Sequence, residues 1–332
     1  MIISRTPFRV SFFGGGTDYP AWFQENTGAT LATTIDKYCW ITCRYLPPFF
    51  DHKSRIIYSK MEHVKSINDI EHPSVREVLR FMKVQEGIEI HHDGDLPART
   101  GLGSSSAFTV GLLNVLYALK GRMVSKEQLA SEAIYVEQEM CRECVGCQDQ
   151  VLAAYGGLNY IEFGGSNHLR VTKVTLSSDK LFELQGHLML FFTGFSRMAS
   201  EIAKHQIKNI PVKKQDLKEL HQMAKEGLRC LDKHDWIRFG KLLDKGWLIK
   251  RQLSDKITTP HVDEIYTAAK KAGALGGKLL GAGGGGFVLI FAEPGRHAAI
   301  RKRLKNFLEI PFRFESLGSQ IIFYQPDSGK VK

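Results

Sequence analysis

One stretch of the sequence has the residue types that a phosphate-binding loop requires. It reads Gly101-Leu102-Gly103-Ser104-Ser105-Ser106-Ala107 and leads into an apolar-periodic stretch over residues 104–119, which predicts a helix. Glycines let a ligand approach the backbone closely, and the helix N-terminus adds free N–H groups with partial positive charge. The alternative interpretation is a glycine turn with an ordinary serine cap. The loop alone does not decide between the two.

Two familiar phosphate motifs are absent. The nearest match to the Gly-x-x-x-x-Gly-Lys-Ser/Thr loop, from Gly273 to Lys278, has the wrong spacing and is followed by Leu279. The loop at residues 101–107 also lacks the Gly-x-Gly-x-x-Gly pattern of dinucleotide-binding folds. A nucleotide site here must therefore be of another kind.

Two further glycine-rich segments support the interpretation of this loop as a phosphate-binding site. Residues 5–19 contain Gly14-Gly15-Gly16-Thr17-Asp18, and residues 278–287 contain Gly281-Ala282-Gly283-Gly284-Gly285-Gly286. With the loop after Pro97, these segments resemble the three motifs of the GHMP kinase superfamily, in order and across nearly the whole chain. The resemblance implies an ATP-dependent kinase that binds ATP through Pro97, Gly101, Leu102, Gly103, Ser104, Ser105, Ser106 and Ala107.

The same resemblance implies an α+β fold of two domains. The N-terminal ATP-binding domain, like domain 2 of ribosomal protein S5, is expected over residues 1–180. A ferredoxin-like C-terminal domain is expected over residues 181–332, with the active site between them. This boundary rests on a change in sequence character near residues 175–185.

Within the superfamily, the chain resembles the heptose-phosphate kinase branch. The resemblance rests on residues 14–18, on 146–159 with Gly146-Cys147-Gln148-Asp149-Gln150, and on 193–197. It implies phosphorylation of the anomeric C1 hydroxyl of D-glycero-D-manno-heptose 7-phosphate, for activated-heptose and surface-polysaccharide synthesis. Other sugar-1-kinases remain an alternative, although galactokinases carry an acid where this chain has Gly15. A non-catalytic regulator that binds ATP and sugar is a third possibility.

Asp149 and Arg9 are the candidate catalytic residues. Asp149 matches the catalytic aspartate of the family and would accept the proton of the sugar hydroxyl, or orient it. Arg9 matches the arginine beside it, and its guanidinium would keep Asp149 ionised and stabilise transferring charge. Without the family match, Asp149 is also a candidate helix N-cap, because the residues after it favour a helix.

A magnesium site is expected beside the phosphate loop. Ser105 and an acid of the predicted helix 125–141 would supply the oxygen ligands that Mg²⁺ prefers. Glu137 and Glu139 are both candidates, and they point in different directions on a helix. Glu137 shares the apolar face and is favoured, because a buried carboxylate needs a partner.

Sugar contacts are assigned to the first and third motifs and to one arginine. Asp18, with Gly16 and Thr17, is expected at a sugar hydroxyl, although an aspartate after three glycines is also a common turn residue. Arg197 is assigned to the distal phosphate of the sugar, with Lys250 or Arg251 as helpers. The segment around Gly283 and Gly284 is expected to close over the substrate.

Regular elements must hold these residues in place. Strands are predicted over residues 30–46, 88–92, 188–192 and 287–291 from β-branched, aromatic or apolar runs. Helices are predicted over 104–119, 125–141, 198–208, 213–232 and 235–253, and after Thr259-Pro260, where proline suits a first turn.

Composition sets the remaining bounds. A net charge of +10 on 332 residues favours anionic partners, but the basic residues are dispersed over predicted helix faces, so a nucleic-acid partner is not expected. Neither a membrane partner nor a signal peptide is indicated, so the protein is expected in the cytoplasm with reduced cysteines. A homodimer is left open. Cys141, Cys144 and Cys147 have metal-ligand spacing, but no fourth ligand is evident nearby.

Overall fold

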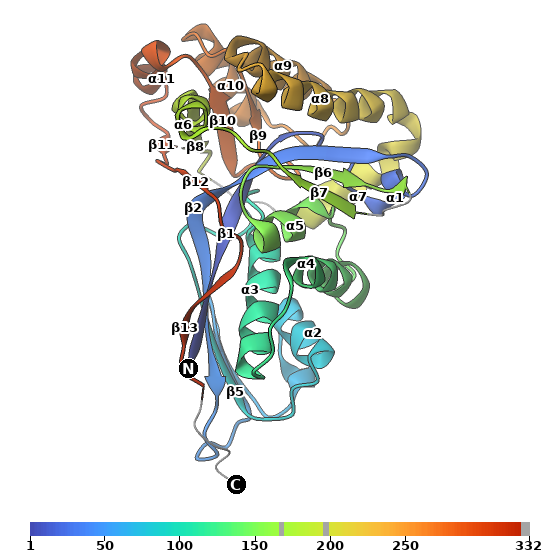
Figure 1. Ribbon diagram of the computed structural model, residues 1–332, viewed down its shortest axis with the longest axis vertical. Coiled ribbons are helices and arrows are strands. Elements are labelled where there is room, and N and C mark those ends of the chain that lie inside the picture. Colours follow the sequence, from blue (N-terminus) through green and yellow to red (C-terminus); the bar gives the residue numbers. More distant parts are fainter. Residues whose placement is uncertain (166–168, 195–198, 327–332) are drawn as a thin grey trace.

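Two largely antiparallel sheets organise the molecule in the computed structural model, which describes residues 1–165, 169–194 and 199–326. Figure 1 shows the larger sheet with helices against one face, and the smaller sheet with the C-terminal helices at the other end. The larger sheet contains β1 (Ile2–Phe13), β2 (Gly28–Tyr45), β3 (Ser54–Ile57), β4 (Met61–Val64), β5 (Ile88–Gly94), β6 (Asn159–Phe163), β7 (Leu169–Lys173), β12 (Phe314–Glu315) and β13 (Gln320–Tyr324). The smaller sheet contains β8 (Leu188–Phe192), β9 (Gly276–Leu279), β10 (Phe287–Phe291) and β11 (Leu308–Glu309).

Strand order explains how distant segments meet. The larger sheet runs β13-β1-β2-β5-β3-β4, with β6 and β12 also on β2, and only the β3–β5 pair is parallel. The smaller sheet runs β11-β8-β10-β9. The β1–β2 pairing joins Ile2 to Cys43 at one end and Phe13 to Leu31 at the other, so it runs along the full length of β1.

The helices of the second half lie mostly where the sequence patterns predict them, whereas several short helices of the first half were not predicted. Those of the first half are α1 (Pro20–Phe23), α2 (Pro73–Phe81), α3 (Ser104–Leu119), α4 (Lys126–Tyr135), α5 (Gln148–Tyr155) and α6 (Ser178–Gly186). Those of the second half are α7 (Ala199–Asn209), α8 (Lys214–Asp232), α9 (Trp236–Lys250), α10 (Pro260–Lys271) and α11 (His297–Arg303). Short 3₁₀ turns occupy Ile67–Asp69, Ile210–Val212 and Pro294–Arg296.

The central helix α3 is apolar on nearly every side. Such a helix is stable only when it is surrounded, and α3 packs on β1 and β2 between α2, α4 and α5. Its bounds, residues 104–119, agree with the prediction. Packing on all sides fixes the first turn of α3, and that turn carries the serines of the predicted phosphate loop.

One predicted helix is shorter than expected. The stretch 125–141 begins as predicted, with the Ser125 hydroxyl accepting the Gln128 N–H at 3.1 Å, but α4 ends at Tyr135. A π-helical turn follows over Val136–Met140. Such turns insert one residue into the helical register, frequently at functional sites, and this one carries both acids considered for a metal.

The chain returns to the first sheet at its C-terminal end. Strands β12 and β13 lie beyond residue 181, yet they pair with β2 and β1. The predicted division into residues 1–180 and 181–332 therefore does not follow the sheets over residues 314–324. Elsewhere that division stays a prediction.

Gly227 provides a test of how α8 packs on the larger sheet. A Cβ at Gly227 would lie 2.5 Å from the Phe13 ring, whereas a Cβ at Gly246 of α9 would meet nothing closer than 3.7 Å. We expect Gly227→Ala to lower the free energy of unfolding by about 1–3 kcal/mol through overpacking. Gly246→Ala, the matched control, should raise it by up to about 1 kcal/mol through helix propensity. Denaturant unfolding measures both, and equal effects would contradict this packing.

Candidate active site

A cleft of about 1030 Å³ collects residues from all three glycine-rich motifs. Its walls include the end of β1, the start of α3, the start of α5 and the beginning of the loop between β9 and β10. Of the predicted residues, those that line the cleft are Arg9, Gly16, Asp18, Gly101, Gly103, Ser104, Ser105, Ser106 and Asp149. Segments far apart in the sequence therefore meet where the family resemblance requires.

Arg9 and Asp149 form a bidentate ion pair in this cleft. Arg9 Nε donates to Asp149 Oδ1 at 2.6 Å, and Nη2 donates to Oδ2 at 2.7 Å. Arg9 is 4% exposed, while the side chain of Asp149 keeps 24% of its surface accessible. The geometry is a charge-assisted fork that fixes the carboxylate while leaving part of it open to a ligand. The N-cap alternative fails, because α5 begins at Gln148 and Asp149 makes no cap hydrogen bond.

The phosphate loop is held from both sides. Arg9 Nη1 donates to the Gly101 carbonyl at 2.5 Å, and the Arg9 N–H donates to the Leu102 carbonyl at 3.0 Å. On the other side, a Cβ at Gly281 would lie 2.4 Å from the Gly101 Cα. The first and third motifs thus clamp the loop, and Gly103, with φ of 74°, turns the chain into α3.

Asp18 is buried in the wall of the cleft, in the turn that follows β1. Its carboxylate accepts the Gly16 N–H at 3.0 Å, as a turn residue would, and the Gln148 side-chain amide at 3.0 Å. A Cβ at Gly146 would lie 2.0 Å from Asp18 Oδ2, so only glycine fits there. Burial, and then the nearby Asp149 charge, raise the pKa of Asp18 above its usual value.

Glu137 is enclosed beneath the first turn of α3. It is fully buried, as predicted for the apolar face, and it accepts from Ser106 Oγ at 2.9 Å and Gln150 Nε2 at 2.5 Å. Burial raises its pKa to about 7. The serine that contacts it is Ser106, whereas Ser105 is exposed and faces the cleft. Glu139 is exposed and does not line the cleft.

Several predicted residues lie outside the cleft wall. Pro97 is exposed, and Leu102 and Ala107 are buried under the loop. The Thr17 hydroxyl is bonded to the backbone of Gly14 and Ala29. Gly283 and Gly284 pack on Ile257, and Gly281 and Ala282 line the cleft in their place. Arg197 lies outside the described residues.

Sequence reasoning missed an aromatic wall at one end of the cleft. Tyr58 stacks edge-on to His72 at 4.9 Å between ring centroids, and Phe108 lies 4.8 Å from His72 and 5.0 Å from His92. All four rings line the cleft. Burial lowers the pKa of His72 to about 4, so its ring is neutral at pH 7. A flat, uncharged base can pack here, but no local pattern joins residues so far apart.

Two lysines also line the cleft, on the side of Asp18. Lys278 precedes the third glycine motif and donates to the Phe12 carbonyl at 2.9 Å. Lys250, considered above as a helper of Arg197, donates to the Gly281 carbonyl at 2.5 Å. Arg251, the other helper, is paired with Asp263 at 2.6 Å and does not line the cleft.

Among the described residues, no group of three His, Cys, Asp or Glu side chains could hold a metal, and this includes the cysteine cluster.

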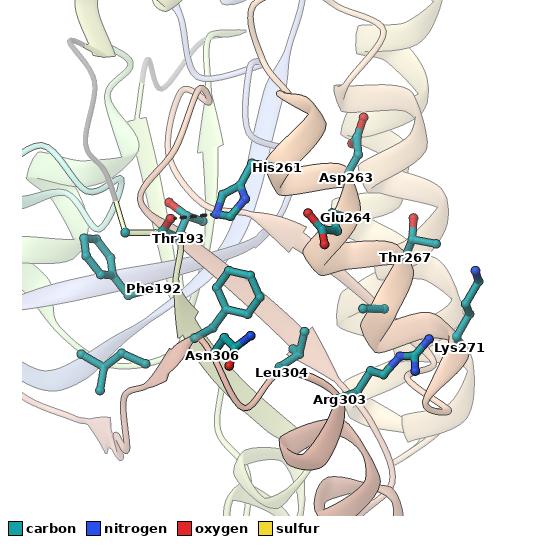
Figure 2. Close-up of a pocket in the computed structure, with 14 residues that line it drawn as sticks. Phe192, Thr193, His261, Asp263, Glu264, Thr267, Lys271, Arg303, Leu304 and Asn306 are labelled. Carbon is teal, nitrogen blue, oxygen red and sulfur yellow. Dashed lines mark hydrogen bonds between the residues drawn. The ribbon is translucent and has the colours of Figure 1, made fainter.

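A second hollow of similar volume lies beside α10 and shares no lining residue with the cleft. Figure 2 shows His261 pointing at the Thr193 carbonyl, 3.2 Å from its Nε2. The Thr193 hydroxyl in turn accepts the Gly286 N–H at 2.9 Å, so this side supports the third glycine motif from behind. Most other lining residues, such as Glu264, Lys271 and Arg303, are exposed. The hollow contains neither the phosphate loop nor the ion pair of Arg9 and Asp149.

Comparison with known proteins agrees with this geometry. The family model for the GHMP kinases N terminal domain matches residues 72–157, and the model for the GHMP kinases C terminal region matches residues 207–310. Together they account for more than half of the chain. The chain is a GHMP kinase. It is therefore a phosphotransferase that uses ATP and an alcohol acceptor, as its curated homologues do.

Individual relatives of this GHMP kinase include sugar kinases and mevalonate kinases, and those curated relatives that cover nearly all of this chain are sugar kinases. D-glycero-alpha-D-manno-heptose 7-phosphate kinase of Campylobacter jejuni is 27% identical over 92% of this chain and 93% of its own length. The bifunctional fucokinase/GDP-fucose pyrophosphorylase of Arabidopsis thaliana is also 27% identical over 91% of this chain, but over only 31% of its own length. These relatives support a GHMP sugar kinase.

Solved structures confirm the expected α+β fold of this GHMP kinase. A structure described as D-glycero-D-manno-heptose 1-phosphate kinase from Bacteroides thetaiotaomicron superposes with a TM-score of 0.79. It covers 96% of this chain and 98% of that one, at 23% identity. Among the described residues, no helix is long and apolar enough to cross a membrane.

The buried Glu137 makes the stability of the metal-free kinase depend on pH. Its folded pKa of about 7 exceeds the usual 4.5, so the folded state holds a proton that the unfolded chain has already lost between these values. The free energy of unfolding should therefore fall by about 3 kcal/mol as pH rises from about 4.5 to 7. Chemical unfolding in a chelator measures this.

Glu137→Gln supplies the control for that measurement. The neutral amide does not titrate, so the variant should lose this decline and exceed the wild type in stability at pH 8, while the two match near pH 4.5. If the free energies of unfolding of the two proteins changed in parallel with pH, ionisation of Glu137 in the folded state would not lower stability, and the prediction would be wrong.

Proposed function

We propose that this kinase transfers the γ-phosphoryl group of ATP to the anomeric C1 hydroxyl of D-glycero-D-manno-heptose 7-phosphate. The product is the 1,7-bisphosphate, which would feed nucleotide-activated heptose and surface-polysaccharide synthesis in the cytoplasm. The observation that carries the proposal is the Arg9–Asp149 pair, set against the phosphate loop with Asp18 in the same cleft. The similarity to the heptose 7-phosphate kinase over nearly the full length of both chains supports the choice of sugar.

Asp149 is the proposed proton acceptor. Its carboxylate is held by Arg9 yet remains partly open to the cleft, so it can accept the proton of a bound hydroxyl. An anomeric hydroxyl is more acidic than an ordinary alcohol, which suits a carboxylate as the proton acceptor. The backbone N–H groups of the loop at residues 101–107 and the N-terminus of α3 would bind the phosphates. The aromatic wall is the proposed place of the adenine base.

A magnesium ion fits the residues beside the phosphate loop. Glu137 Oε1 is buried and has no hydrogen-bond partner among the described residues, which is costly without a cation. We propose that Glu137 and Ser105 hold Mg²⁺, with Ser106 bonded to the other carboxylate oxygen of Glu137. Bound there, Mg²⁺ would neutralise phosphate charge. Neither candidate acid lines the cleft, but Glu137 is buried against Ser106 of the phosphate loop, whereas Glu139 is exposed and is not proposed as a ligand.

The sugar is proposed to bind between Asp18 and the third glycine motif. Asp18 would accept from a sugar hydroxyl, next to Gly16, while Thr17 shapes the turn from behind. Gly15 also lines the cleft, and a Cβ there would meet nothing closer than 3.7 Å. A side chain would therefore fit at this position, and the glycine leaves that part of the cleft open to the sugar. Arg197 stays the proposed partner of the distal phosphate.

A fucokinase-like activity is the second candidate. It is favoured by the plant fucokinase relative, which is as similar over this chain as the heptose kinase is. The two candidates differ in whether the acceptor already carries a phosphate.

An acceptor screen tests the proposed reaction. ADP release would be measured with heptose 7-phosphate, fucose, galactose and mevalonate, on the wild type and on Asp149→Asn. We expect turnover on heptose 7-phosphate and a loss of at least about 100-fold in kcat for the variant, because the amide cannot accept the proton. Activity on unphosphorylated sugars alone would refute the proposed acceptor and support the second candidate.

A further inference from the structure

Lys250 stands out because its charge is buried without an acid beside it. It is the last residue of α9, it is 6% exposed, and it lines the catalytic cleft. No carboxylate in the described part of the chain lies within 4 Å of its ammonium. Its hydrogen bonds go to the carbonyls of Gly281 at 2.5 Å and Leu279 at 3.3 Å. An ammonium has three protons, so one has no acceptor among the described residues.

At the end of the cleft that holds Lys250, the cationic side chains outnumber the acidic ones. Arg9, Lys250 and Lys278 face Asp18 and Asp149, and the positive charge of Arg9 is already matched by Asp149. Asp18 is satisfied by the Gly16 N–H and the Gln148 amide, not by a lysine. A buried cation without a counter-ion is costly, and a bound anion would remove that cost. Burial and the Arg9 charge accordingly lower the pKa of Lys250 to about 8.

The position of Lys250 identifies which anion it meets. Its ammonium is tied to Gly281, which packs against Gly101 at the start of the phosphate loop. Arg9 donates to the carbonyl of that same Gly101 and holds Asp149 beside it. Lys278, by contrast, is tied to the Phe12 carbonyl of β1. Lys250 is thus fixed where the phosphate loop, the third glycine motif and the proton acceptor come together.

We propose that Lys250 is a catalytic cation that contacts a non-bridging oxygen of the γ-phosphoryl group during its transfer. In this step the bond from the γ-phosphorus to the β–γ bridging oxygen breaks, and its electron pair leaves on ADP. A bond forms from the same phosphorus to the acceptor oxygen, whose proton goes to Asp149. Lys250 keeps its own protons and stabilises the charge on the moving group. The inference rests on the assignment of Asp149 but not on which sugar is the acceptor.

A purely structural role for Lys250 predicts a different pH dependence. A neutral amine still has two N–H donors, enough for the carbonyls of Gly281 and Leu279, so an anchor would survive deprotonation. A catalytic cation would not. The charged groups that face this ammonium are Arg9 from β1, Asp18 from the loop after it, Asp149 from α5 and Lys278 from β9.

The test is a set of pH profiles between pH 6.5 and 9.5 for the wild type, Lys250→Arg and Lys250→Met. Lys245→Met is the matched control, because Lys245 lies on the same helix but is exposed and paired with Glu219. For the wild type, kcat/KM should fall above about pH 8, since it reports the free enzyme. Lys250→Arg should lose that fall, because arginine does not titrate there. Lys250→Met should lose at least about 100-fold in kcat, with the KM of the sugar changed less than about threefold.

Three results would overturn the inference. They are a kcat for Lys250→Met within about threefold of the control, an alkaline fall that persists in Lys250→Arg, or a KM that rises only for phosphorylated acceptors. The last result would instead assign Lys250 to the distal phosphate. If Lys250→Met does not fold, the profile of Lys250→Arg alone decides. The assay uses whichever sugar the wild type accepts, so failure on heptose 7-phosphate counts against the proposed function and not against Lys250.

Discussion

The bidentate ion pair between Arg9 and Asp149 is the interaction on which the rest of the site depends. Arg9 comes from the long strand β1 and Asp149 from the first turn of α5, so the pair joins the sheet to the helical layer. The same guanidinium holds the carbonyl of Gly101. Because breaking a buried ion pair leaves an uncompensated charge, the phosphate loop and Asp149, the proposed proton acceptor, are fixed relative to each other. A kinase needs that alignment more than any single contact.

Close backbone approach is the second constraint, and it explains the glycines. Gly101 and Gly281 touch where the first and third motifs clamp the phosphate loop, and Gly146 leaves room only for the carboxylate of Asp18. A side chain at any of these positions would push apart groups that must meet a ligand. The charged groups near the phosphate loop are also closely packed. Two buried lysines and two buried acids, Asp18 and Glu137, lie around the phosphate loop, and none of the four forms an ion pair among the described residues.

The sequence predicted most of what is local and little of what depends on tertiary packing. Helix α3, strand β8 and the glycine motifs follow from short patterns. The family resemblance predicted that Arg9 lies beside Asp149. The π turn that carries Glu137 has no such pattern, because one inserted residue leaves the helical periodicity almost intact. It is packing that decides that Ser106 bonds Glu137 and that Gly281 lines the cleft in place of Gly283. The return of β12 and β13 and the aromatic wall are long-range pairings that single-sequence patterns do not encode.

The most direct test of this account is a double-mutant cycle on phosphoryl transfer with Arg9→Gln, Asp149→Asn and the double variant. Three N–H groups of the Arg9 side chain donate to Asp149 and Gly101. The contribution of Arg9 to kcat should therefore depend mainly on the Asp149 carboxylate. The account predicts strong non-additivity, with the kcat of the double variant within about threefold of that of Asp149→Asn alone. Losses that simply multiply would show that the two residues act independently and would contradict the central role given to the pair.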